Sequence, residues 1–178
     1  RIVGTLRTNG FDGSPWIEAG RLPSVAGSIA LDAGLDSIGV DGTLVSAAVG
    51  DGPVRLQGNG RWLDRTIEIA ALRAWLPRSS LSASIAGSVK LVAEQDPLLE
   101  LTGEWTALRW PLAGEPVFES PIGAFTLQGA MPYAFEVQTH ALLPGLPVAE
   151  FAAAGSFDRE RLVLDRLDGK AFGGRVSG

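Results

Sequence analysis

Strict alternation of apolar and polar residues constrains this chain more than any other feature. From Leu81 to Leu91 every odd position is apolar or glycine, and every even position is serine, alanine or lysine. Successive side chains of a strand point to opposite faces of a sheet, so the pattern predicts a strand with one apolar and one polar face. A slip of one residue would exchange the two faces, so the register must be tightly specified.

Similar apolar stripes recur along the chain. We call their residues the candidate lining residues, because together they would line one face of the sheet. Their usual role is to pack in a protein core; the alternative is a face that contacts something other than protein. The set is Val54, Leu56, Trp62, Ile67, Ile69, Leu81, Ile85, Val89, Leu91, Leu99, Leu101, Trp105, Phe125, Leu127, Phe135, Val137, Phe151, Leu162, Leu164, Phe172 and Val176.

Glycine recurs inside these predicted strands. Many of the 23 glycines sit in short, similar phrases such as Ala26-Gly27-Ser28, Ala86-Gly87-Ser88 and Ala154-Gly155-Ser156. Glycine weakens a strand unless it permits a bend, a bulge or a close backbone approach. We therefore expect the glycines to curl the sheet along one line. Only Ala70–Leu76, which Pro77 stops, has the pattern of a short helical turn.

Composition excludes several classes of protein. The chain is 46% hydrophobic, yet no run approaches the ~18 apolar residues of a membrane helix. Net charge is −5 and the basic residues do not cluster, which argues against nucleic acid or an anionic membrane surface as a partner. Without cysteine there is no disulfide framework and no thiolate metal site. Alternation persists throughout, so residues 1–178 are predicted to be one continuous repetitive β segment of a longer chain.

Residues that could carry chemistry are sparse. His140 is the single histidine, lies on a polar stripe and has no Gly-x-Ser-x-Gly motif to accompany it, so we expect a solvated surface residue. Asp32, Asp36 and Asp41 do not have EF-hand spacing and suit turns and caps. Glu100 and Glu104 share one strand face, as acidic residues of a wet surface do. The sequence thus predicts no enzyme, no metal and no cofactor.

Three sequence segments resemble those of a known family. They are Leu101–Leu112, Ser120–Gly129 and the closing run Leu164–Gly178, in which Asp168-Gly169 precedes Gly173-Gly174-Arg175-Val176. This pattern resembles the repeats of the TamB/AsmA-like family, large envelope proteins of diderm bacteria. The resemblance extends from about Thr66 to Gly178 and is looser before Thr66.

The resemblance implies a single long, mostly antiparallel curved sheet, a U-shaped trough similar to a β-taco with an apolar concave face. It also implies an inner-membrane-anchored protein that extends through the periplasm and moves phospholipid to the outer membrane. On this hypothesis the candidate lining residues contact phospholipid acyl chains. An Omp85-type outer-membrane barrel is a further implied partner, contacted by other parts of the protein.

Two other interpretations remain open from the residues alone. A β-sandwich or β-solenoid with a structural or adhesive role also has one apolar face per strand. A glycan-active enzyme on a β-scaffold is less well supported, because convergent catalytic groups are lacking. An unfilled apolar face favours the trough, and two sheets in contact favour the sandwich.

Overall fold

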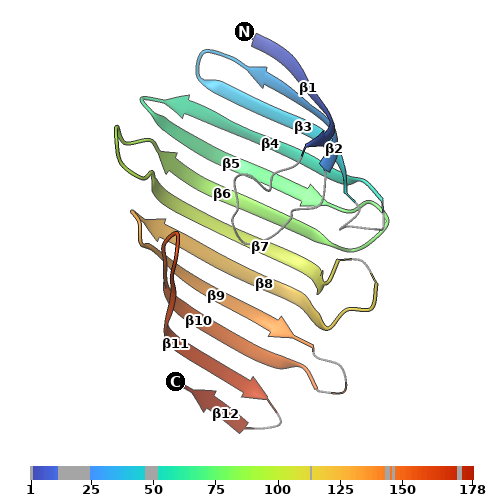
Figure 1. Ribbon diagram of the computed structural model, residues 1–178, viewed down its shortest axis with the longest axis vertical. Helices are drawn as coiled ribbons and strands as arrows, with labels where there is room; N and C mark the ends of the chain where they lie inside the picture. Colours follow the sequence, from blue (N-terminus) through green and yellow to red (C-terminus); the bar gives the residue numbers. More distant parts are fainter. Residues whose placement is uncertain are drawn as a thin grey trace.

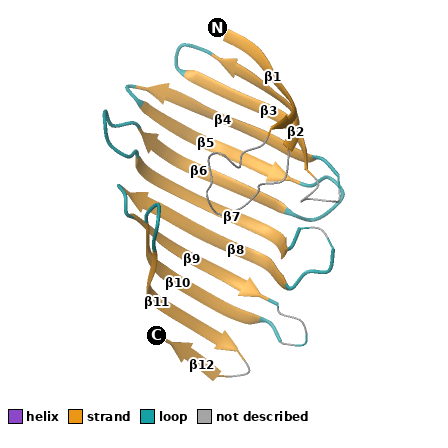
Figure 2. Ribbon diagram, in the orientation of Figure 1, coloured by secondary structure: helices purple, strands orange, loops and turns teal. Residues whose placement is uncertain are grey.

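The computed structural model describes residues 2–11, 25–46, 52–112, 114–142, 145, 147–171 and 174–178. In these residues it contains strands and no helix (Figure 2). The strands are β1 Ile2–Phe11, β2 Val25–Ala33, β3 Ser37–Ser46, β4 Val54–Leu63, β5 Thr66–Trp75, β6 Ser82–Lys90, β7 Leu98–Trp110, β8 Phe118–Gly129, β9 Tyr133–Ala141, β10 Ala149–Phe157, β11 Leu162–Ala171 and β12 Gly174–Ser177.

All twelve described strands belong to one sheet, in which they follow one another in chain order. Every neighbouring pair is antiparallel. The sheet twists along its length and places β1 and β12 at opposite ends (Figure 1). This architecture confirms the prediction of an all-β fold with a single long antiparallel sheet. The sandwich and the solenoid are not the fold of the described residues.

The pairing register gathers the predicted apolar stripes on one face of the sheet. Leu101 lies opposite Gly87 and Leu127, and Leu127 lies opposite Phe135. We call the face that carries these residues the apolar face. The other face carries rows such as Ser84, Glu104, Ala124 and Gln138, and we call it the polar face.

No second layer covers the apolar face in the described part of the chain. The accessible surface is 12122 Å², whereas a compact monomer of 18.6 kDa exposes about 8,200 Å². Among the described residues, the only buried hydrophobic side chains are Leu76, Tyr133, Ala141 and Ala149. The sheet is therefore a single layer without a closed hydrophobic core.

The glycines have a different role from the one expected. They do not lie opposite one another along one line, since Gly87 faces Leu101 while Gly103 faces Ile85 and Phe125. The prediction of a single bend line is therefore wrong. A Cβ on Gly103 would collide with the Phe125 ring. Missing side chains thus let large rings lie flat over the neighbouring strand.

The same arrangement occurs at two more glycines. A Cβ on Gly123 would collide with the Trp105 indole, and one on Gly169 would lie 3.0 Å from Phe151 Cδ1. Each ring covers backbone that would otherwise face water, so glycine and ring act as a pair across two strands.

The predicted helical turn at Ala70–Leu76 is also wrong, because β5 continues as a strand to Trp75. The register of β5 shifts between Ile69 and Leu72, where the strand contains a bulge. The extra residue spaces Ile69, Leu72 and Leu76 at i, i+3 and i+7, which is also the spacing of an apolar helix face. The bulge therefore imitates helical periodicity in the sequence.

Replacing Gly123 tests the pairing of glycine with aromatic rings. We expect Gly123→Ala to displace Trp105 and destabilise the chain by about 1–3 kcal/mol, the usual cost of overpacking. Gly4→Ala is the matched control, since a Cβ on Gly4 meets nothing within 4 Å, and we expect it to stay within about 0.5 kcal/mol. Urea unfolding measures both. Equal midpoints for the two variants would contradict the pairing.

Candidate functional site

The apolar face carries the residues that the sequence predicted as a lining. Those with described side chains lie on this face or, for Leu81 and Leu91, continue its alternation at the two ends of β6. None of these is buried, and Leu162 and Leu164 are 65% and 55% exposed. Phe172 and the side chain of Val176 lie outside the described residues.

Sequence reasoning missed several members of the apolar face, for two physical reasons. Leu72 and Leu167 follow bulges in β5 and β11, where the period of two is interrupted. Tyr133 and Phe157 stand at strand ends beside turns, where too few residues remain to show alternation. A search that allowed one inserted residue per strand would have found the first two.

The strand ends that carry the β6–β7, β8–β9 and β10–β11 turns form one edge of the sheet, where contacts cross between strands. Tyr133 lies at the start of β9, and its hydroxyl donates a hydrogen bond of 3.2 Å to the carbonyl oxygen of Pro97, which precedes β7. On a flat sheet β7 and β9 are about 9.6 Å apart. The Tyr133 ring also packs on Phe157, with centroids 5.7 Å apart. These contacts tie the ends of β7, β9 and β10 together at this edge.

A small polar network holds Trp105 in place on the apolar face. Its indole Nε1 donates a hydrogen bond of 2.6 Å to Ser120 Oγ, which lies 2.7 Å from Thr139 Oγ1. Ser120 is the only described polar side chain that is buried, at 0% exposure. Because its hydroxyl is fully hydrogen-bonded, its burial costs little. The network fixes the indole over Gly123 and beside Phe125.

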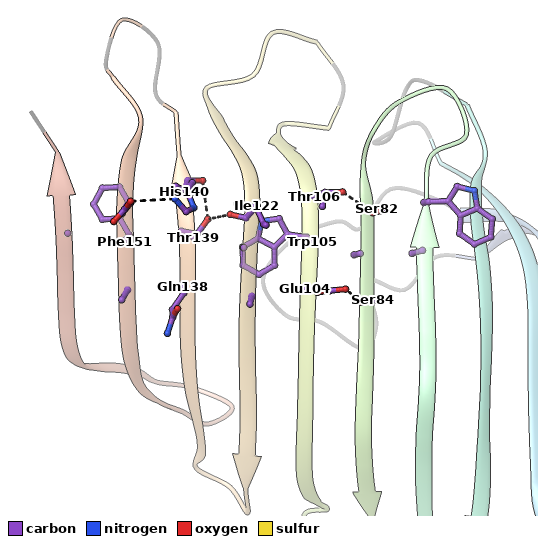
Figure 3. A pocket seen from close by; sticks show the side chains of 18 of the residues that line it. Ser82, Ser84, Glu104, Trp105, Thr106, Ile122, Gln138, Thr139, His140 and Phe151 are labelled. Carbon is purple, nitrogen blue, oxygen red and sulfur yellow. Dashed lines mark hydrogen bonds and ion pairs between the residues drawn. The ribbon is translucent and has the colours of Figure 1, made fainter.

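A groove of about 990 Å³ lies on the polar face, opposite the expected lining. Two adjacent rows of that face line it, including Ser82, Ser84, Glu104, Thr106, Gln138 and His140 (Figure 3). The row between them also contributes, so that Trp105 and Phe151, which the sequence predicted as lining of the apolar face, border this groove as well.

Several polar side chains of this groove pair with their neighbours across adjacent strands. Glu150 lies 3.6 Å from both His140 Nε2 and Lys170 Nζ, and Ser84 donates a hydrogen bond to Glu104. The side chain of His140 is 47% exposed, as expected of a solvated surface residue. No group of three or more potential metal ligands occurs among the described residues. This groove therefore resembles an ordinary solvated surface on which neighbouring polar side chains contact one another.

The two faces together define a single-layer, amphipathic β-sheet protein whose apolar face lacks a protein cover in the described residues. A family model described as "TamB, N-terminal domain" matches residues 54–178, which begin at β4 and include β12. The chain therefore belongs to the TamB family of envelope proteins. No curated protein and no solved structure matches it significantly. The described residues include no helix that could cross a membrane.

Removing the Ser120 hydroxyl tests the network. Ser120→Ala leaves the Trp105 indole N–H without its partner at a part-buried position, so we expect a loss of about 1 kcal/mol. Ser82→Ala is the control: its hydroxyl pairs with Thr106 at an exposed site, and we expect a change within about 0.5 kcal/mol. Thermal unfolding of the two variants measures the difference. If Ser120→Ala melted at the wild-type temperature, the network would not hold Trp105.

Proposed function

We propose that this chain is a section of a hydrophobic conduit that shields phospholipid acyl chains on their way between the inner and outer membranes. Its role in outer-membrane biogenesis follows from that transport. The observation that carries the proposal is the apolar face, which continues from strand to strand without a second layer among the described residues. Exposed apolar patches on soluble proteins usually mark a binding surface.

The energy of lipid transfer supports this use. Each methylene that leaves water contributes about 0.8 kcal/mol, so a sixteen-carbon chain gains on the order of 12 kcal/mol on a continuous apolar surface. Such a gain is large beside the total stability of a protein domain, roughly 5–15 kcal/mol. An apolar face of this kind therefore has a strong preference for acyl chains over water.

The dimensions suit an extended lipid. A strand of ten residues, such as β4 or β5, spans about 33 Å, and twelve strands at about 4.8 Å spacing extend over roughly 53 Å. One strand length is comparable to an extended acyl chain. The described sheet is a section of a bridge rather than a complete crossing of the periplasm.

The proposed role is passive. The lining acts collectively, the headgroups stay wet, and no side chain performs chemistry, so we propose that the chain is not an enzyme and needs no cofactor. We place it in the periplasm of a diderm bacterium as part of an inner-membrane-anchored protein. An Omp85-type barrel would engage other parts of that protein. A closed structural or adhesive sandwich is less well supported, because it would need a second sheet on the apolar face.

The decisive variants change two adjacent residues of β7 that lie on opposite faces of the sheet. Leu101→Asp puts a carboxylate into the proposed lipid path, and Glu100→Arg changes only the wet face. Since Leu101 is half-buried rather than sealed, we expect Leu101→Asp to leave the abundance of the full-length protein near normal while outer-membrane integrity is lost. Glu100→Arg should be silent.

Protein abundance and outer-membrane integrity must both be measured in the same cells. Loss of the protein itself in Leu101→Asp would indicate a sealed core, because an unpaired buried carboxylate costs several kcal/mol. That result would contradict the conduit.

A further inference from the structure

One ion pair links two turns that are distant in the sequence. Arg159, in the turn between β10 and β11, places its Nη2 atom 2.7 Å from Asp96 Oδ1, in the turn between β6 and β7. The two residues are 63 positions apart. The turn between β8 and β9 separates them in the sheet, and on a flat sheet β7 and β10 would be about 14 Å apart. The pair therefore crosses this edge of the sheet.

A second contact crosses the same edge beside the ion pair. The Tyr133 hydroxyl bonds to Pro97, beside Asp96, while its ring packs on Phe157, which ends β10 two residues before Arg159. Phe135 also contacts Phe157, with centroids 6.2 Å apart. Tyr133 and Phe135 belong to the apolar face, so this aromatic layer lies over the end of the proposed lipid path.

The turn that carries Arg159 is stiffened by its own hydrogen bonds. The Asp158 carboxylate accepts from the backbone N–H groups of Glu160 at 2.9 Å and Arg161 at 2.8 Å. The Asp158 backbone N–H in turn bonds to the Arg161 carbonyl oxygen at 2.9 Å. These hydrogen bonds hold the hairpin tip that carries Arg159 in one conformation.

We propose that the Asp96–Arg159 pair, together with the adjacent Tyr133–Pro97 contact, forms a strap across this edge of the apolar face. The strap opens to let an acyl chain enter or leave the apolar face sideways. This inference rests on the proposed function, since it names how that same face is loaded. The Arg159 side chain is 75% exposed. An exposed ion pair is weak and is screened by salt, so the strap opens readily and closes again without unfolding the sheet.

Charge reversal of the two partners tests the strap. The full-length protein is loaded with a phospholipid that carries a pyrene-labelled acyl chain, and release into excess unlabelled phosphatidylethanolamine vesicles is followed by fluorescence. We expect Asp96→Arg and Arg159→Asp each to speed release, by up to about fivefold, the limit that an exposed ion pair allows. The double variant, which restores the pair in reverse, should return to nearly the wild-type rate.

Two controls separate the strap from other effects. Arg175→Asp breaks the 3.2 Å pair with Asp168 near the C-terminal edge and should leave the release rate unchanged. High salt should speed release from the wild type, where it weakens the ion pair, and slow release from Arg159→Asp, where it screens the repulsion between the two carboxylates.

The possible results distinguish failure of the strap from failure of the conduit. Single variants that release lipid at the wild-type rate, or a double variant that stays fast, would overturn the strap and leave the conduit standing. A wild-type protein that takes up no labelled lipid would overturn the conduit and the strap with it.

Discussion

The backbone hydrogen-bond ladder between consecutive strands is the interaction on which this structure depends. In most domains a hydrophobic core joins elements that are distant in the sequence, but here the described strands form a single layer. Each strand is therefore held chiefly by the strand before it and the strand after it. Stability in such a molecule is close to a sum of neighbour interactions, as in repeat proteins. A defect in one strand should thus remain local.

Because backbone hydrogen bonds between strands hold the sheet together, the side chains of its two faces can have different roles. Side chains of the apolar face support the ladder by covering neighbouring backbone, as Trp105 does at Gly123 and Phe125 does at Gly103. These contacts lie within the layer and do not require a cover. The polar face satisfies its charges locally, as Glu150 does with His140 and Lys170. An amphipathic single layer of this kind can present a long apolar surface without collapsing on it.

The sequence was sufficient to predict features that depend on residues close together along a strand. It was insufficient to predict contacts between residues that are distant in the chain. Period-two alternation predicted the strands and the shared face of Leu101, Leu127 and Phe135, and the family resemblance implied the single sheet. Alternation failed at the β5 bulge, where one extra residue imitates a helix. It gave no signal for Asp96 and Arg159, whose contact depends on the curvature of the sheet. The hydrogen bonds of Ser120 were likewise hidden, because bulges and turns decide which way that hydroxyl points.

Site-specific photo-crosslinking in living cells tests most directly that lipid occupies the apolar face. Leu127 and Gln128 are consecutive residues of β8, the first half-buried on the apolar face and the second exposed on the polar face. With a photoreactive amino acid at each position in turn, the account predicts phospholipid adducts at 127 and none at 128. Equal labelling at the two positions, or protein adducts alone at 127, would contradict it.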